Sequence, residues 1–119
     1  MNKTRILIVD DEVKFTRMVK LSLEKLGVYE VREENRAKQA LAAARDFRPD
    51  LILLDVVMPD ADGGDVRSKF ADDPELKDIP IIFLTALVDT TVNSAGMEFI
   101  AKPVTLQKLT ERIQENLKK

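Results

Sequence analysis

The sequence predicts an α/β protein in which a parallel β-sheet is covered by helices on both faces. Three runs of largely apolar residues are typical of strands buried on both faces, and they span residues 5–9, 51–54 and 80–84. Segments with helical spacing of apolar residues separate them, and strand and helix alternate five times along the chain. Such alternation indicates parallel strands that are joined by right-handed crossovers.

The elements of the first half follow from apolar spacing and turn residues. The helix after the first strand is expected to have one inward face, which is largely apolar and consists of Phe15, Met18, Val19, Ser22, Leu23 and Leu26. Gly27 is its expected C-cap. The charges within residues 28–33 favour a strand at an exposed edge. Asn35 is the expected N-cap of a second helix, which Pro49 ends. The inward residues of that helix are expected to be Ala37, Ala40, Leu41, Ala44 and Phe47.

The second half continues the same pattern. Residues 58–64 form a loop, in which Asp60 and Asp62 are interpreted as turn formers. A short helix passes through Val66 and Phe70, and residues 98–101 form a last short strand. Thr105 is expected to cap the terminal helix. The apolar stripe of that helix consists of Leu106, Leu109, Ile113 and Leu117.

Length and composition narrow the class of protein. The 119 residues predict one domain with a single hydrophobic core. A formal net charge of −2, from 19 basic and 21 acidic residues, gives no reason to expect nucleic acid or an anionic membrane as a partner. The chain contains no cysteine and no histidine, which excludes thiol chemistry, thiolate or imidazole metal ligands and a phosphohistidine on this chain.

The predicted strands end in residues that carry chemistry. Asp10 and Asp11 follow the first strand, Asp55 and Thr85 end two others, and Lys102 follows the last. Because the carboxyl ends of parallel strands lie at one edge of the sheet, these side chains are expected to meet there. Crowded carboxylates repel one another, so this edge requires positive charge.

Oxygen ligands without histidine or cysteine favour a hard cation, which is Mg²⁺ or, as a substitute, Mn²⁺. An aspartate beside such a cation and a lysine is equipped to accept a phosphoryl group as an aspartyl-phosphate. Asp55 is the predicted nucleophile, and the metal, the Lys102 ammonium and the Thr85 hydroxyl would meet the charge on the transferring phosphoryl group.

Five short motifs then carry a resemblance to a known family. The chain resembles the receiver domain of bacterial two-component response regulators over essentially its whole length. The motifs span residues 8–12, 53–59, 62–63, 84–86 and 99–103. The resemblance implies a flavodoxin-like sheet with the strand order 2-1-3-4-5.

The resemblance also implies roles for individual residues. Asp55 would receive its phosphoryl group from a phosphohistidine on a sensor histidine kinase or a histidine phosphotransfer protein. Asp11 and Asp55 would bind Mg²⁺ directly together with the backbone carbonyl of Val57, while Asp10 would act mainly through water. Each of these residues, taken alone, has an ordinary structural interpretation, and only the joint pattern favours the functional one.

Thr85 and Phe99 would form a switch pair, in which the hydroxyl turns toward the phosphoryl group and the ring follows inward. We expect a single receiver domain over residues 1–119, with no output domain in the chain and no catalysis beyond its own phosphorylation and dephosphorylation. We further expect a downstream protein target, no direct contact with nucleic acid or membrane, and a cytoplasmic location. The sequence does not decide the oligomeric state, and a homodimer is one alternative.

One segment departs from the family pattern, and two alternatives stay open. The chain between Thr85 and Phe99 is shorter than is usual for receivers, so the fourth helix is expected to be short or irregular. The main alternative is a receiver-like interaction module that works without phosphorylation. The second is an aspartyl phosphatase, which the apolar Val56 and Val57 after Asp55 disfavour because neither could protonate a leaving group.

Overall fold

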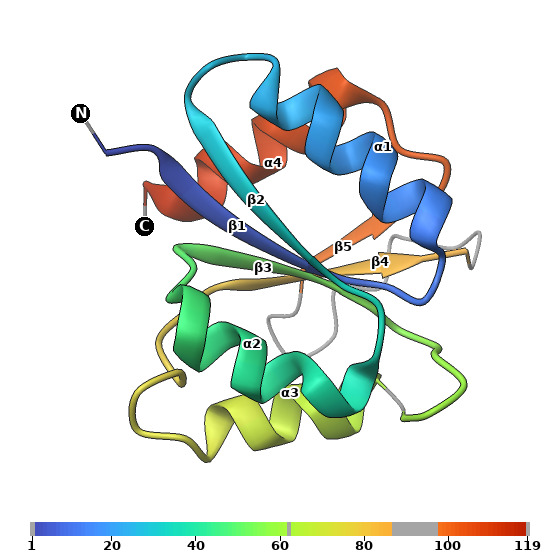
Figure 1. Ribbon diagram of the computed structural model, residues 1–119, viewed down its shortest axis with the longest axis vertical. Coiled ribbons are helices and arrows are strands. Elements are labelled where there is room, and N and C mark those ends of the chain that lie inside the picture. The colour runs from blue at the N-terminus through green and yellow to red at the C-terminus, as the bar shows by residue number, and fades with distance from the viewer. Residues whose placement is uncertain (1, 62, 87–97, 119) are drawn as a thin grey trace.

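The computed structural model of the protein describes residues 2–61, 63–86 and 98–118. Within these residues, one sheet of parallel strands has the order β2-β1-β3-β4-β5, which confirms the predicted order (Figure 1). The strands are β1 (Thr4–Val9), β2 (Tyr29–Glu34), β3 (Leu51–Asp55), β4 (Ile81–Thr85) and β5 (Glu98–Ala101). As expected from its charges, β2 lies at an edge of the sheet.

Helices cover both faces of the sheet, as the alternation of elements predicts (Figure 1). One face carries α1 (Val13–Glu24) and α4 (Leu106–Leu117), which contact each other. The other face carries the short 3₁₀ helix η1 (Ala37–Gln39) with α2 (Ala40–Phe47) and α3 (Gly63–Ala71).

The strands supply side chains to two hydrophobic cores, because successive residues of a strand point to opposite faces. In β1, Ile6 and Ile8 pack with residues of α1 and α4, whereas Leu7 and Val9 pack with residues of α2 and α3. The same alternation holds along β3 and β4. All four of these β1 side chains are fully buried, so the centre of the sheet is a rigid base for whatever follows the strands.

Parts of the predicted helix faces are wrong. Met18 and Leu26 are 45% and 48% exposed, because Met18 lies off the buried stripe of α1 and Leu26 lies beyond the end of the helix. The C-cap of α1 is Lys25, and Gly27 supplies the left-handed turn that follows, with a φ of 86°. In α4, Leu109 and Ile113 are buried as predicted, but two other residues of the stripe are exposed in its terminal turns: Leu106 and Leu117.

Asn35 is not the N-cap that the sequence predicts. Arg36 is extended, so η1 begins one residue later and leaves Asn35 too far upstream to cap it. The Asn35 amide instead donates to the backbone carbonyl of Asp10 at 2.8 Å and to the Thr16 hydroxyl at 3.0 Å. Asn35 therefore ties the end of β2 to the segment that follows β1.

Asp60, which was interpreted as a turn former, makes the capping contacts in place of Asn35. Its carboxylate accepts hydrogen bonds from the backbone amides of Ala37 at 3.1 Å and of Lys38 at 3.0 Å. The Lys38 amide, more than any other group, holds the pKa of Asp60 below its usual value. The loop after β3 is thereby fastened to the first turn of η1, which lies more than twenty residues earlier in the chain.

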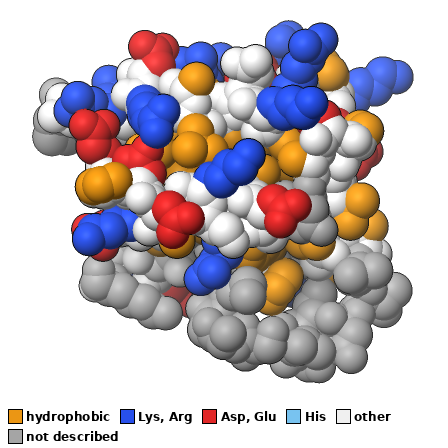
Figure 2. Space-filling view, turned by 90° about the horizontal axis from the view of Figure 1, so that it is seen from below, with side chains coloured by type: hydrophobic (Ala, Val, Ile, Leu, Met, Phe, Trp, Pro, Cys, Tyr) orange, Lys and Arg blue, Asp and Glu red, His pale blue; other side chains and the backbone are white. Residues whose placement is uncertain are grey.

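The predicted fourth helix falls on residues 87–97 and lies outside the described residues. The part of the chain that the structure describes contains no helix long and apolar enough to cross a membrane. Figure 2 looks onto the face covered by α2 and α3, where basic side chains stand among acidic and hydrophobic ones without a patch of one sign in the described part of this view.

Replacing Asp60 by alanine should lower the midpoint of thermal unfolding by several degrees, because two backbone amides at the start of η1 would lose their acceptor. The exposed Asp78 offers a matched control, since Asp78→Ala removes the same group away from this contact. Calorimetry of both variants measures the effect. Equal midpoints for the two variants would contradict the capping role of Asp60.

Candidate functional site

The carboxyl ends of the strands meet in one pocket, as the sequence predicts. The pocket has a volume of about 320 Å³. It is lined by Asp11, Glu12, Asp55, Val56, Val57, Thr85, Ala86 and Lys102. Asp10 reaches the same place from beneath, because its carboxylate pairs with the Lys102 ammonium. All the predicted catalytic residues are therefore brought together.

Strand periodicity explains which side chains face one another. Asp10 continues the series Ile6 and Ile8 by one further step, and Asp55 continues the series of Leu51 and Leu53 in β3. The carboxylates of Asp10 and Asp55 therefore emerge above the core formed with α1 and α4. Lys102 continues β5 in the same way, since its backbone amide donates to the Thr85 carbonyl at 2.7 Å.

Lys102 is the cationic centre of the site. Its ammonium nitrogen lies 2.7 Å from Asp10 Oδ2, 2.8 Å from Glu12 Oε1 and 3.8 Å from Asp55 Oδ1. It also lies over the ring of Phe15, 4.6 Å from the centroid. Burial lowers the pKa of Lys102, but the bonds to Asp10 and Glu12 outweigh it and raise the pKa above its usual value. Lys102 therefore stays charged.

Two of the residues that contact Lys102 were not singled out from the sequence. Glu12 was included only within the motif of residues 8–12, and Phe15 was assigned only to a helix face. The signal that could have found them is their position, since both lie within one turn of Asp11 at the start of α1.

Asp10, Asp11 and Asp55 form a cluster with the geometry of a cation site. One carboxylate oxygen of each lies within 4.8 Å of the others. Asp10 is fully buried, Asp55 is 7% exposed and Asp11 is exposed, so one side of the cluster opens to solvent. Oxygen ligands in this arrangement fit a hard divalent cation such as Mg²⁺ and exclude a site built for thiolate or imidazole ligands.

The Asp55 carboxyl group is in an unfavourable place for a negative charge. Burial is the largest effect on its pKa, and together with Asp10 and Asp11 it raises the pKa to about 6, against the opposing influence of Lys102. A hydrogen bond from the Val57 backbone also opposes the rise. Val57 thus contributes its backbone to the Asp55 carboxylate, whereas the predicted role of its carbonyl as a metal ligand stays a prediction.

Asp10 is held on every side by the surrounding chain. Its backbone amide donates to the Glu34 carbonyl at 3.0 Å, and its own carbonyl accepts from the Asn35 amide. Its Oδ1 accepts from the backbone amide of Glu12 at 2.9 Å, while Oδ2 faces Lys102. These contacts fix the buried carboxylate in place, so Asp10 cannot turn away from the cluster.

The predicted switch pair lies on one face of the sheet. Thr85 is 5% exposed and, two residues after Phe83 in β4, falls on the same face as that ring. Phe99 stacks on Phe83 with ring centroids 5.3 Å apart and an interplanar angle of 24°. Phe99 is also partly buried against the core formed with α2 and α3. The switch role of Thr85 and Phe99 stays a prediction.

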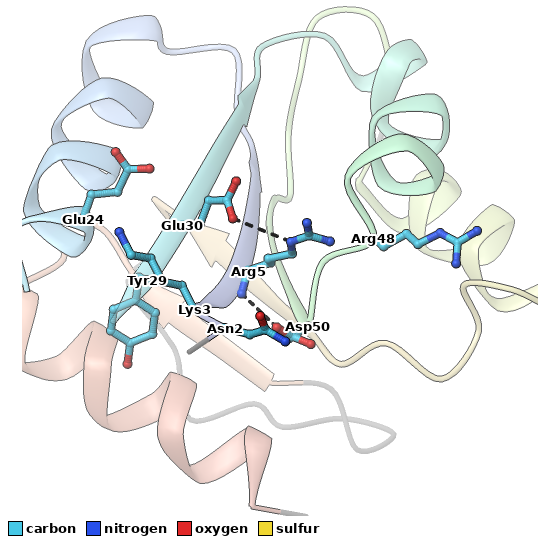
Figure 3. A pocket seen from close by; sticks show the side chains of 8 residues that line it. All are labelled: Asn2, Lys3, Arg5, Glu24, Tyr29, Glu30, Arg48 and Asp50. Carbon is cyan, nitrogen blue, oxygen red and sulfur yellow. Dashed lines mark hydrogen bonds and ion pairs between the residues drawn. The ribbon is translucent and has the colours of Figure 1, made fainter. Parts of the chain in front are cut away.

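A larger hollow of about 950 Å³ lies at the opposite edge of the sheet, near the amino ends of the strands (Figure 3). Arg5, the charged residue at the centre of this hollow, already has partners for its side chain and its backbone amide. The Arg5 side chain pairs with Glu30 at 3.7 Å, stacks over Phe47 and donates to the Phe47 carbonyl, while the Arg5 backbone amide bonds to Asp50. These paired charges serve the fold, and the hollow lacks the crowding of like charges that marks the other edge.

The fold and the site together define a doubly wound α/β protein with an acidic cation site and a lysine at the carboxyl ends of its strands. Residues 6–114 match the response regulator receiver domain. The chain belongs to this family.

Known proteins resemble the chain along nearly its whole length. It is 37% identical to the phosphate regulon transcriptional regulatory protein PhoB of Pseudomonas aeruginosa, covering 96% of this chain and 52% of PhoB. It is 32% identical to the polar-differentiation response regulator DivK of Brucella anthropi, covering 94% of each chain. The structure of the chemotaxis protein CheY4 of Vibrio cholerae superposes with a TM-score of 0.85 at 27% identity, covering 95% of this chain and 98% of CheY4.

The chain spans about half the length of the first curated relatives that it matches, PhoB among them. It matches DivK, by contrast, over nearly the full length of that protein.

Asp55→Asn should stabilise the protein in the absence of divalent cations, and more so as the pH rises. Because the pKa of Asp55 is about 6 in the folded protein and 3.8 as the reference value, the folded state binds this proton more tightly. Ionisation between these two values therefore destabilises the fold. The stability difference between variant and native protein should grow from pH 4 to pH 7, to at most about 3 kcal/mol. Urea unfolding in EDTA across this range measures it, and a difference that shrinks with pH would contradict the prediction.

Mg²⁺ should raise the midpoint of thermal unfolding of the native protein, because a cation bound among the three carboxylates stabilises only the folded state. Asp11→Asn should abolish most of this gain, whereas Asp50→Asn, at the far edge of the sheet, should keep it. Thermal scans with and without Mg²⁺ test the site without any phosphoryl donor. An equal gain in both variants would place the cation elsewhere.

Proposed function

We propose that the protein is a phosphoacceptor in two-component signalling and that Asp55 is the residue that takes the phosphoryl group. The observation that carries this proposal is the meeting of Lys102 with three carboxylates at the carboxyl ends of the strands, around an aspartate whose pKa is raised. Neither packing nor stability accounts for this crowding, since it costs free energy in the folded state.

The proposed reaction is a direct displacement at phosphorus. A lone pair of a carboxylate oxygen of Asp55 forms the new P–O bond while the P–N bond of a phosphohistidine on the partner breaks, and its electron pair returns to the imidazole nitrogen, which takes a proton from solvent. Lys102 and the Thr85 hydroxyl would contact the phosphoryl oxygens, on which negative charge is spread in the transition state. With a pKa of about 6, Asp55 is mostly ionised at neutral pH and needs no general base.

Asp11 and Asp55 are the proposed direct ligands of Mg²⁺, with Mn²⁺ as a substitute, and the Val57 carbonyl is the proposed third. Asp10, which is buried beneath the cluster and bonded to Lys102, would contribute through water. The bound cation would supply positive charge to the phosphoryl oxygens. The membership of the receiver family and the cluster of carboxylates support this assignment.

The proposed partners follow from the family. A sensor histidine kinase or histidine phosphotransfer protein would donate the phosphoryl group, and a downstream protein would bind the changed surface near Thr85 and Phe99. The phosphoryl chemistry would be limited to the protein's own phosphorylation and dephosphorylation. We propose residues 1–119 as one receiver domain that works in the cytoplasm, where ATP-dependent histidine phosphorylation takes place.

Incubation with acetyl phosphate and Mg²⁺ should add one phosphoryl group, which intact-mass measurement detects. Asp55→Asn should remove the adduct, because the carboxylate that attacks phosphorus is gone. Asp50→Asn, which alters an aspartate at the opposite edge of the sheet, should retain it. A receiver-like module that works without phosphorylation predicts no adduct with acetyl phosphate or with a histidine kinase, and that result would refute the proposal.

Lys102→Met should slow phosphoryl uptake by roughly a hundredfold, because the variant keeps the length of the side chain and loses the charge that faces the phosphoryl oxygens. The exposed Lys77 provides the control, since Lys77→Met removes one positive charge far from the pocket. Time courses of adduct formation measure both rates. Equal rates in the two variants would show that Lys102 has no part in the transfer.

A further inference from the structure

The structure points to a regulatory role for Glu12, a residue outside the predicted site. We propose that the Glu12 carboxylate holds the Lys102 ammonium away from Asp55 before phosphorylation and thereby slows phosphoryl uptake. This inference rests on the proposed function, and it makes Glu12 a positioning residue that acts through Lys102.

The distances around Lys102 carry the inference. Its nitrogen lies 2.8 Å from Glu12 Oε1 and 2.7 Å from Asp10 Oδ2, both of which are hydrogen-bond distances. It lies 3.8 Å from Asp55 Oδ1, which is too far for a hydrogen bond. With the ring of Phe15 beneath it at 4.6 Å, the ammonium is directed toward partners other than Asp55. Lys102 is thus adjacent to the phosphoacceptor without contacting it closely.

Of the two close partners, only Glu12 can leave at small cost. The Asp10 side chain is fully buried and is fixed by the backbone amide of Glu12, so it has no water to turn to. The Glu12 side chain is 61% exposed, and on release its carboxylate enters solvent. An ion pair with one exposed partner contributes little free energy, so it can break during a reaction without a large barrier.

The role of Lys102 in the proposed transfer requires such a release. A close contact with the phosphoryl oxygens on Asp55 requires the ammonium to move toward Asp55 from its present distance of 3.8 Å, and the 2.8 Å contact with Glu12 opposes that movement. Because Asp10 stays in place, the Glu12 contact is the one that breaks when the ammonium moves. The Glu12–Lys102 contact therefore belongs to the state before transfer, and it stabilises that state relative to the transition state.

The consequence is an asymmetry between uptake and loss of the phosphoryl group. Uptake starts from the state in which Glu12 is bound to Lys102, so removal of the contact should accelerate it. Loss starts from the phosphorylated state, in which Lys102 has already left Glu12, so removal of the contact should have no comparable effect. A general change in the charge of the pocket, by contrast, would act on both rates.

The test compares three variants by intact mass, with acetyl phosphate as donor for uptake and with donor removed for loss. Glu12→Gln removes the charge that holds Lys102, and it should accelerate uptake about two- to fivefold, as expected for an exposed ion pair. Glu12→Asp keeps the charge but shortens the side chain by one methylene group, and it should also accelerate uptake because the shorter carboxylate loses its close contact with Lys102. Glu34→Gln removes one negative charge at the same edge of the sheet, at a residue whose carboxylate bonds to the Arg36 amide.

The results expected and those that overturn the inference are distinct. For each variant, the fold-change in the uptake rate relative to the native protein is divided by the fold-change in the rate of loss. This ratio should be about two to five for both Glu12 variants and about one for Glu34→Gln. If Glu12→Gln leaves uptake unchanged or slows it, or if it changes uptake and loss by one factor, Glu12 does not hold Lys102 in the proposed way. If Glu12→Asp behaves as the native protein does, charge alone is responsible and the contact is not. A native protein that takes up no phosphoryl group would instead refute the proposed function.

Discussion

The pairing of Lys102 with the buried carboxylate of Asp10 is the interaction on which the rest of the site depends. Lys102 Nζ lies 2.7 Å from Asp10 Oδ2, and the Asp10 side chain has no exposure to water. A carboxylate buried to this extent requires a cation beside it. Because Asp10 follows the inner strand β1 and Lys102 follows the edge strand β5, the pair also joins the ends of two strands that are not neighbours, next to Asp55. The placement of Lys102 is thereby set by Asp10, and the contacts with Asp55 and Glu12 follow from it.

The sheet beneath the site provides the free energy that keeps like charges together. The rise in the pKa of Asp55 to about 6 corresponds to at most about 3 kcal/mol. Full burial of one Leu or Ile side chain contributes about 1.5–3 kcal/mol, and the strand segments before Asp10 and Asp55 bury several such side chains completely. Hydrophobic burial within a few residues of the site therefore offsets its electrostatic cost.

The sequence predicted the meeting of Asp10, Asp55 and Lys102, because apolar runs locate buried strands and parallel strands place their ends at one edge. The strand order, by contrast, was predicted from the resemblance to receiver domains. It did not predict the contacts of Asn35 or Asp60. Capping patterns assume a partner two or three residues away, whereas Asp60 reaches Ala37 from a loop distant in sequence. The hold of Glu12 on Lys102 is equally non-local, and nothing in local spacing indicates which of several neighbouring acids a lysine will meet.

The carboxylates of the protein differ in a way that separates structural from functional acids. Asp73 accepts hydrogen bonds from Arg45 and from the Glu75 amide, and the Arg45 contact, more than any other, lowers its pKa. The pKa of Asp60, the capping carboxylate, is likewise lowered by its hydrogen-bond donors. Among the described carboxylates whose pKa is clearly shifted, only Asp55 has a pKa that is raised. An acid that stabilises the fold is surrounded by donors, whereas an acid that awaits a cation and a phosphoryl group is left with too few of them.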